Sequence, residues 1–178
     1  MQEIRIHGRG GQGVKTTARI LGRAGFLQGF CTQDFAIYGA ERRGAPVASF
    51  CRLSKGEILT RGYIFEPDAV IVLDPTVGRE NVLKGAKKKS RIIVNSGKPL
   101  KGYPGGTVFV DATRIALDTL GKPIPNIAVL GGFVRAFGMV TIGSLKKAVK
   151  VELTYDEHPE AIPGNIKACE RCYREVKA

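Results

Sequence analysis

The stretch that decides the fold is residues 4–17, with the sequence IRIHGRGGQGVKTT. Apolar residues alternate before the four glycines, which is typical of a β-strand, and from residue 18 to 27 they recur three and four positions apart, which predicts a helix. Glycines suit this junction because the backbone must reverse there, often with positive φ. The helix begins with unpaired N–H groups and partial positive charge, so we expect an anion site, strengthened by Arg9 and Lys15.

Two phosphate-binding patterns come close to this loop. Gly8, Gly10 and Gly13 satisfy the dinucleotide pattern G-x-G-x-x-G, and Asp34 follows at a distance suited to the acidic residue that binds a ribose. The loop also resembles a P-loop, but its lysine comes one residue late, which disfavours an NTPase. A tight strand-to-helix turn that binds no nucleotide is the remaining alternative.

The length and composition are those of one ordinary globular domain, residues 1–178. Apolar residues make up 43% of the chain and charged residues 25%. The sequence has no apolar run of membrane-spanning length and no signal-peptide pattern at its start, so we expect a cytoplasmic chain with no membrane contact. Four cysteines are too sparse for a disulfide framework, which predicts reduced thiols.

The net charge is the unusual quantity, because 28 Lys and Arg against 16 Asp and Glu give a formal charge of +12. Such a field attracts polyanions, anionic cofactors or acidic protein partners. The densest basic run, residues 84–91, lies between an expected helix and an expected strand, which is typical of solvated surface. A nucleic-acid module would place aromatic residues among the basic ones or carry a reading motif. The sequence has neither, so we expect no nucleic-acid partner.

The second and third strands depart from the dinucleotide pattern. Residues 30–37 read as a second alternating strand, but the loop 38–46 leads directly into another strand, residues 47–53, where a Rossmann unit would have a helix. A further extended segment is expected around Ile58 and Leu59. We therefore expect two or three neighbouring strands to form a hairpin rather than a crossover.

Strands and helices alternate in the rest of the chain, which predicts an α/β fold of three layers. The sheet should be mainly parallel, flanked by helices, Rossmann-like and contained in a single domain. The apolar runs that predict its further strands are residues 69–75, 91–96 and 107–111. The expected helices cover residues 77–85, residues 114–120 behind an Asp111 cap, a segment opened by Pro125 and Asn126, a segment from a Ser144 cap to about Leu153, and about a dozen residues from Pro163.

Cys169 and Cys172 are spaced like a metal or redox pair. A zinc or iron–sulfur site needs four ligands, and the other thiols, Cys31 and Cys51, lie singly in expected strands. A redox pair would begin a helix, where the dipole lowers the thiol pKa, whereas this pair lies well inside one on its apolar stripe. We expect both thiols to pack in the core and predict no metal site.

Polar residues at the ends of strands are candidates for a site. Asp34, Glu41, Asp74 and Asp111 end strands or lie in loops, so we expect them to gather at one edge of the sheet, where α/β folds bind ligands. His7 is a candidate neighbour of the glycine loop. No serine, cysteine or carboxylate set around the histidines suggests a catalytic triad.

Two adjacent arginines stand out in the run Glu41-Arg42-Arg43-Gly44. Ordering them in a glycine- and proline-braced loop is costly unless they meet an anion, and a guanidinium suits carboxylate or phosphate. The alternative is a flexible basic surface loop. Because this loop and the glycine loop follow consecutive early strands, we expect them to face one ligand or one partner.

Two motifs together resemble a known family. HGRGGQG at residues 7–13 and YGAERRGAP at residues 38–46 are similar to the gamma subunit of the 2-oxoacid:ferredoxin oxidoreductases, the pyruvate and ketoisovalerate enzymes. The similarity continues through PDAVIVLD at residues 67–74 and GNIKA at residues 164–168. It therefore spans nearly the whole chain.

The resemblance implies a chain that is not catalytic alone. The family's enzyme oxidatively decarboxylates a 2-oxoacid on thiamine diphosphate, captures the acyl group as acyl-CoA and passes electrons through iron–sulfur clusters to ferredoxin. Thiamine diphosphate, Mg²⁺ and the [4Fe-4S] clusters are then carried by partner subunits of alpha, beta and delta type, against which the gamma subunit packs. The family's twofold symmetry implies a homodimer, and the 2-oxoacid stays open because its pocket belongs mostly to the partners.

We therefore expect a gamma subunit of such a complex whose glycine loop also receives the phosphates of CoA. The alternative is a free-standing NAD-type domain with Asp34 on the ribose. The candidate cofactor-binding residues are Gly8, Arg9, Gly10, Gly11, Gln12, Gly13, Lys15, Thr16, Arg42 and Arg43. The candidate partner interface consists of Tyr38, Gly39, Glu41, Arg42, Arg43 and Gly44.

Overall fold

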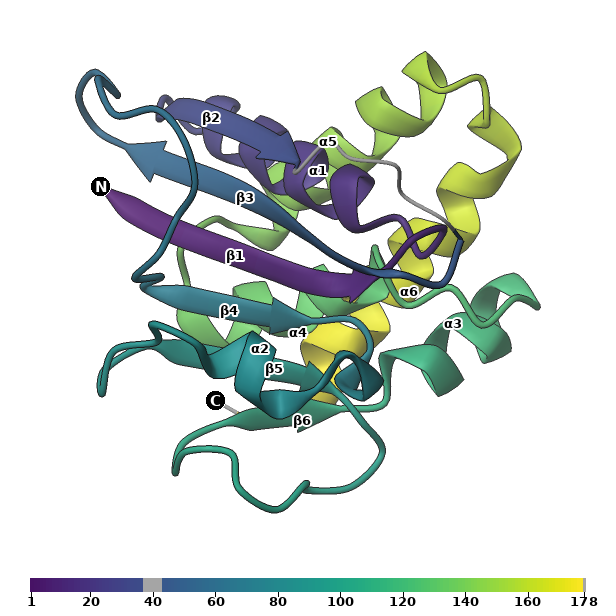
Figure 1. Ribbon diagram of the computed structural model, residues 1–178. Coiled ribbons are helices and arrows are strands. Elements are labelled where there is room, and N and C mark those ends of the chain that lie inside the picture. Colours follow the sequence, from purple (N-terminus) through teal and green to yellow (C-terminus); the bar gives the residue numbers. More distant parts are fainter. Residues whose placement is uncertain (37–42, 178) are drawn as a thin grey trace.

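Strand β1 (Gln2–Arg9) lies inside a six-stranded sheet of order β2-β3-β1-β4-β5-β6 (Figure 1). The structure, a computed structural model, describes residues 1–36 and 43–177. β3 pairs antiparallel with β1 and β2, whereas β1, β4, β5 and β6 pair in parallel, so β3 alone opposes the common direction. The other strands are β2 (Cys31–Ala36), β3 (Pro46–Ser54), β4 (Ala69–Val72), β5 (Arg91–Asn95) and β6 (Val108–Val110).

This topology confirms the expected mainly parallel sheet and the hairpin of the second and third strands. The segment around Ile58 and Leu59, in contrast, is not a strand, and that expectation is wrong. Its two apolar residues do not face a core, because Leu59 is 85% exposed and the backbone farther along the segment is bound by two buried arginines.

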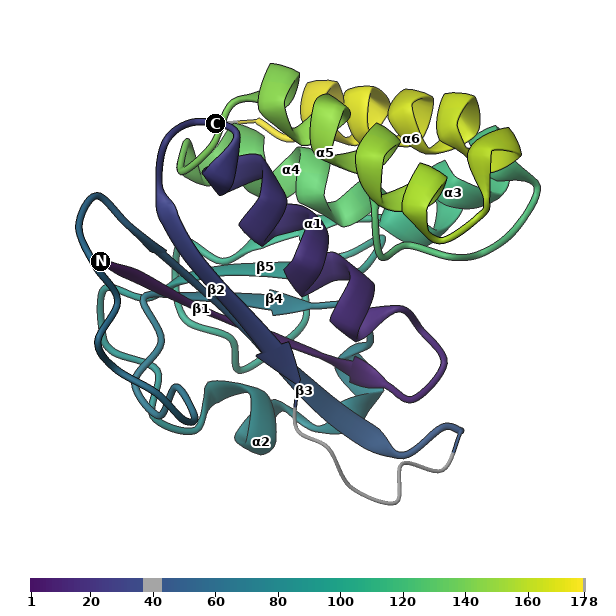
Figure 2. The ribbon, with the colours of Figure 1, turned by 90° about the horizontal axis from the view of Figure 1, so that it is seen from above.

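The helices cover the two faces of the sheet unequally. One face carries most of them, with α6 packed on α3, α4 and α5, and the other carries α2 and loops (Figure 2). Among the helices of residues 1–36 and 43–177, none is long and apolar enough to span a membrane. The bounds are α1 (Val14–Phe26), η1 (Pro75–Val77), α2 (Arg79–Leu83), α3 (Ala112–Leu120), α4 (Ala128–Phe137), α5 (Ile142–Tyr155), η2 (Pro159–Ala161) and α6 (Ile162–Glu175).

Helix α5 begins earlier than its sequence suggests. Thr141, not Ser144, is its N-cap, and the Thr141 Oγ1 accepts the backbone N–H of Ser144 at 3.2 Å. The Ser144 hydroxyl lies inside the first turn and donates to the side chain of Gln28 at 2.5 Å. The expected Ser144 cap is therefore wrong, because both hydroxyl residues have capping chemistry and only the first occupies the extended conformation of a cap.

Helices α4 and α6 approach closely because of two glycines that the sequence shows inside α4. A Cβ on Gly131 would lie 2.0 Å from the carbonyl oxygen of Cys169, and one on Gly132 would lie 3.1 Å from the Cys172 sulfur. Both thiols are buried, and the Cys169 Sγ donates to the carbonyl oxygen of Ile127 at 3.1 Å. Burial raises the pKa of Cys172 to about 12, and that of Cys169 further. These thiols pack in the core, as expected.

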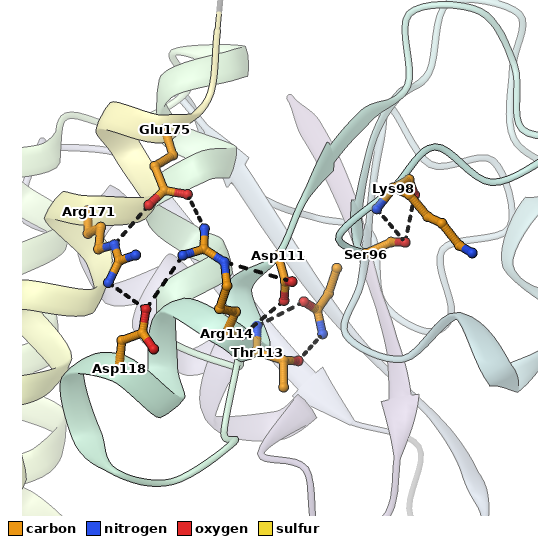
Figure 3. Close-up of polar contacts among 9 residues, drawn as sticks. Ser96, Lys98, Asp111, Thr113, Arg114, Asp118, Arg171 and Glu175 are labelled. Carbon is orange, nitrogen blue, oxygen red and sulfur yellow. Dashed lines mark hydrogen bonds and ion pairs between the residues drawn. The ribbon is translucent and has the colours of Figure 1, made fainter.

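Ion pairs on the surface join α6 to α3 (Figure 3). Arg114 contacts Glu175 at 2.7 Å, and Arg171 contacts Asp118 and Glu175, each at 2.8 Å. Pairs this exposed contribute about 0–1 kcal/mol each. They orient α6 rather than hold the fold together.

The face of the sheet opposite the helices contains a buried cation. Side chains alternate along β1, so Ile4 and Ile6 join the helical core while Arg5 points the other way. The Arg5 guanidinium donates to the carbonyl oxygens of Ile64 and Phe65 and, at the C-terminal end of α2, of Val82 and Lys84, at 2.5–3.3 Å. It thus fixes α2 and the segment after β3 onto the sheet.

His7 and Arg52 complete the environment of this face. The His7 Nε2 accepts the Arg5 Nε–H at 2.9 Å, and burial, followed by the charge of Arg5, lowers the pKa of His7 to about 4. Arg52, 1% exposed, contacts Glu3 at 2.8 Å and donates to the carbonyl oxygen of Gly62 at 3.0 Å. Two buried guanidinium groups therefore hold the segment between β3 and β4.

Replacing Arg5 by Ala should lower the free energy of unfolding by about 3 kcal/mol, because the carbonyl groups that it binds would remain buried without donors. Urea denaturation of the two proteins measures this difference. The exposed Lys88, changed to Ala, is the control and should stay within about 0.5 kcal/mol of wild type. An Arg5→Ala protein as stable as that control would contradict the role given to Arg5.

Candidate functional site

The glycine loop lies at a place where the chain leaves the sheet in two directions. After β1 it turns to the helical face through residues 10–13 and enters α1, whereas after β4 it turns to the opposite face through η1 (Figure 2). β1 and β4 are parallel neighbours. Such a switch point, at the carboxyl ends of adjacent strands, is where open α/β sheets bind ligands.

The glycines of the loop serve different purposes. A Cβ on Gly8 would lie 2.7 Å from a methyl group of Val14, and one on Gly13 would lie 2.2 Å from the Nδ2 of Asn126. These two glycines allow close packing within the protein. Gly11 has φ +90° and no heavy atom within 4 Å of the Cβ position, so it serves the turn itself.

Arg9 joins the glycine loop to two others. Its Nε donates to the Thr76 hydroxyl at 2.9 Å, and its terminal nitrogens donate to the carbonyl oxygens of Gly44 and Thr76, both at 2.8 Å. Asp74 lies 3.5 Å from the Nε. The guanidinium is thus a clamp between the loops that follow β1, β2 and β4.

Gln12 and Asp74 close the same network. The Gln12 side-chain oxygen accepts the backbone N–H of Arg9 at 2.8 Å, and its amide donates to Asp74 at 2.8 Å. Asp74 also caps η1 by accepting the Thr76 N–H. Partial burial raises the pKa of Asp74, but hydrogen bonds from Thr76 and Gln12 and the charge of Arg9 outweigh it, so the pKa lies below its usual value.

The glycine loop and the arginine-containing loop lie side by side, as expected. The Gly10 N–H donates to the carbonyl oxygen of Ala45 at 2.8 Å, and the Gly44 N–H donates to that of Gly10 at 3.1 Å. Arg43 is exposed and Gly44 has φ +85°. Four predicted interface residues, Tyr38, Gly39, Glu41 and Arg42, lie outside the described residues.

A hollow of about 220 Å³ lies between the glycine loop and the ends of β2 and β3. Helix α1 begins at it, and Gly13, its N-cap, forms no side-chain cap within the described residues. Two predicted residues face elsewhere, since Gln12 lines a neighbouring crevice and Thr16 lines a cavity behind α1. The residues around the hollow are Arg9, Gly10, Gly11, Gly13, Val14, Lys15, Ala36, Val47, Ala48 and Ser49.

The neighbouring crevice, of about 390 Å³, lies directly at the switch point. Asn95, at the end of β5, forms part of its wall and donates to the carbonyl oxygen of Leu73 and the hydroxyl of Thr113, both at 2.8 Å. Figure 3 shows Thr113 at the start of α3, and the backbone N–H of Thr113 donates to the Asn95 Oδ1 at 3.1 Å. The sequence analysis missed Asn95 and Thr113, although a polar residue ending an apolar strand run is the signal that could have found Asn95.

Asp34 does not occupy the ribose-binding position of a dinucleotide fold. It lies within β2 and faces α1, where its Oδ1 would be 3.2 Å from a Cβ on Gly22. It lines a cavity with Arg19, Arg23 and Glu152, away from the glycine loop. Asp74 and Asp111 do follow the carboxyl ends of β4 and β6, but the expected gathering is wrong for Asp34, because Asp34 lies within β2 rather than at its end and faces α1. Glu41 lies outside the described residues.

These features define an α/β chain with a glycine loop at a switch point, clamped to a second loop that bears arginines. The family model for pyruvate ferredoxin/flavodoxin oxidoreductase matches residues 3–175, and the chain belongs to this family.

Relatives support this assignment over the whole length. Pyruvate synthase subunit PorC of Methanocaldococcus jannaschii is 47% identical over 177 residues, which are 99% of this chain and 97% of the relative. The pyruvate/ketoisovalerate oxidoreductases common subunit gamma of Pyrococcus furiosus is 46% identical over 158 residues, 84% of this chain and 85% of the relative. The crystal structure of pyruvate oxidoreductase subunit PORC from Thermotoga maritima has a TM-score of 0.84 at 34% identity, covering 99% of this chain and 97% of that one.

These matches confirm the family resemblance and the α/β fold. They give no support to the alternative of a free-standing NAD-type domain, and the position of Asp34 removes the acidic residue on which that alternative depended.

Asp74→Asn should reduce the stability of the protein in a pH-dependent way. Because the folded-state pKa of Asp74 is lowered, the carboxylate stabilises the fold above its unfolded-state pKa of about 3.9, and this contribution is lost as the pH falls through the folded-state pKa. We expect a deficit of about 1 kcal/mol at pH 7 that shrinks below about pH 4. Urea titrations at several pH values measure it.

The control for this measurement is Glu57→Gln, because Glu57 is exposed on the segment after β3. A deficit at Asp74→Asn that is the same at every pH would contradict the charge-dependent network around Arg9.

Proposed function

We infer that this chain is the gamma subunit of a 2-oxoacid:ferredoxin oxidoreductase, a complex that converts a 2-oxoacid to acyl-CoA in a CoA-dependent oxidation. The observation that carries this inference is the 47% identity to a pyruvate synthase subunit over 99% of the chain. The same alignment favours pyruvate or a related 2-oxoacid as the substrate. Within this assignment, the chain contributes to an oxidoreductase without being catalytic alone.

The electron-transfer and thiamine chemistry would then belong to partner subunits of alpha, beta and delta type, in the cytoplasm, with ferredoxin as acceptor. The described thiols do not provide the set of cysteine ligands that a [4Fe-4S] cluster needs, because they lie on three different elements. Cys31 is exposed on β2, Cys51 is buried on β3, and Cys169 and Cys172 are buried on α6. Thiamine diphosphate and Mg²⁺ are assigned to the partners on the family assignment alone.

The loop of residues 38–44 is the proposed contact with the partner subunits. Its end is attached to the glycine loop by the two Gly10 hydrogen bonds and by Arg9. A partner bound at this loop would therefore also affect the position of the glycine loop and of the start of α1. A homodimer of the whole assembly, built about a twofold axis, is part of this proposal.

The CoA part of the proposal uses the hollow at the start of α1. Unpaired N–H groups and the helix dipole favour an anion there, and Lys15 and Arg9 add positive charge. The volume of about 220 Å³ is below the range of about 300–1,000 Å³ typical of complete small-molecule sites. The hollow therefore suits the phosphates of CoA, with Arg42 or Arg43 pairing and Gly8, Gly10, Gly11, Gln12, Gly13 and Thr16 forming or supporting the loop.

Purification of the tagged chain from its own anaerobically grown cells tests the main inference. We expect stoichiometric partners that contain thiamine diphosphate and iron, identified by mass, and CoA-dependent oxidation of a 2-oxoacid by the eluate. A chain that elutes alone and without activity would contradict the subunit assignment.

The CoA contact is tested separately in the assembled complex. Arg42→Ala and Arg43→Ala should each raise the apparent KM for CoA by about tenfold, the effect of one lost charge-assisted hydrogen bond. The control is Lys55→Ala, because Lys55 is exposed beyond the end of the antiparallel β3 and so at the opposite edge of the sheet. An unchanged KM in an intact complex would refute the CoA contact while leaving the subunit assignment standing.

A further inference from the structure

A cavity with a volume of about 640 Å³ has no role in the proposed function. It lies behind the first turn of α1, between the ends of α3 and α5 and the starts of α4 and α6. Its size is within the range typical of small-molecule sites. The wall is formed by Thr16, Thr119, Leu120, Lys122, Ile124, Asn126, Ile127, Leu153, Asp156, His158, Glu160, Ala161, Gly164 and Asn165.

Asn126 presents an unused amide at this cavity. The residue is only 7% exposed, and its side chain forms no hydrogen bond to any residue within 1–36 or 43–177. Its position is fixed, because its backbone oxygen accepts the Thr17 hydroxyl at 3.2 Å and its Nδ2 abuts Gly13. The hydrogen-bonding capacity of the amide is therefore directed to the contents of the cavity. A ligand in the cavity would supply the missing hydrogen bond.

Three helices bring their N-terminal ends to the same wall, through Thr16 of α1, Ile127 before α4 and Gly164 of α6. Within the described part of the chain, none of the three has a side-chain cap or an acidic residue in its first turn. Helices α3 and α5 begin elsewhere, capped by Asp111 and Thr141, and end at this cavity. Helix starts carry partial positive charge and helix ends partial negative charge, and both effects fall off within one turn, so an anion is favoured at Asn126, beside the starts of α1 and α4.

The charged side chains on the wall are compatible with this sign. Lys122 is exposed and basic, Asp156 has an arginine partner, and Glu160 is exposed to the screening of solvent. Asp156 pairs with Arg19 at 2.7 Å, and Glu160, 73% exposed, lies 3.4 Å from the His158 ring. The acidic groups therefore do not cancel the field of the helix starts at Asn126.

The rest of the wall is apolar. Leu120, Ile124 and Leu153 contribute aliphatic surface, and Ile124 is 43% exposed although it is a large apolar side chain. An inorganic anion would leave this surface in contact with water. We propose that the cavity binds a small amphipathic organic anion, with its phosphate or carboxylate group at Asn126 and its apolar part on Leu120 and Ile124.

This site is distinct from the hollow proposed for CoA, which lies on the glycine-loop side of α1 and is lined by Lys15 rather than Thr16. Neither proposal depends on the other. Asn126 and Gly13 are in contact, so the two sites share the first turn of α1 as a common wall.

Titration of the full-length ¹⁵N-labelled chain with phenyl phosphate tests the proposal by NMR. We expect saturable shifts of the backbone amides of Thr16, Ile124, Asn126 and Asn165, and tighter binding of phenyl phosphate than of inorganic phosphate. Shifts confined to Gly10, Gly11 and Lys15, or no saturation at millimolar concentration, would overturn it.

Asn126→Asp and Lys122→Glu should each weaken phenyl phosphate binding by about tenfold or more, because the first places a negative charge at the anion position and the second reverses the charge of the lysine that lines the cavity. Lys55→Glu is the matched control, since it makes the same charge change at the opposite edge of the sheet and should leave the affinity unchanged. Lys122 is exposed, so its variant tests the site even where Asn126→Asp fails to fold. Equal affinity in Lys122→Glu and in Lys55→Glu would refute the proposed orientation of the anion.

Discussion

The antiparallel pairing of β3 with β1 is the constraint on which the site depends. It places the start of β3 beside the end of β1, so that the Gly10 backbone binds Ala45 and Gly44 across the two loops. A helix between the second and third strands, as in a dinucleotide fold, would carry Gly44 and Ala45 away from the glycine loop. Because β3 lies between β1 and β2 in the sheet, the turn that would bind a nucleotide in a dinucleotide fold lies beside a second loop here.

Much of the fold could be predicted because its signals are local. Apolar runs ended by polar or turn residues identified β4, β5 and β6. The β2–β3 hairpin was identified because the sequence of residues 38–46 leads directly into another strand pattern. The positions of Asp34 and of the α5 cap could not be predicted. Asp34 is a polar residue in a strand whose facing element is set by packing, and Thr141 and Ser144 have the same capping chemistry.

The sequence allowed the approach of the two loops to be predicted, but not the individual hydrogen bonds of the site. The spacing of two motifs indicated that the glycine and arginine loops meet, and they do. That the Arg9 guanidinium binds Gly44 and Thr76 follows from the distance between β1 and β4, which no local pattern records. The place of Asn126 at a cavity could not be predicted for the same reason, since it depends on the contact with Gly13, which is distant in the sequence.

The two buried arginines beneath the segment between β3 and β4 have a consequence for how this part of the chain can vary. Arg5 and Arg52 bind carbonyl oxygens of that segment, and every amino acid has such an oxygen. The path of the segment therefore depends little on its exposed side chains, such as Leu59 and Phe65, whereas Ile64 is buried and Tyr63 stacks on Phe50. During divergence of the family, the exposed positions can change while the backbone beneath them keeps its course.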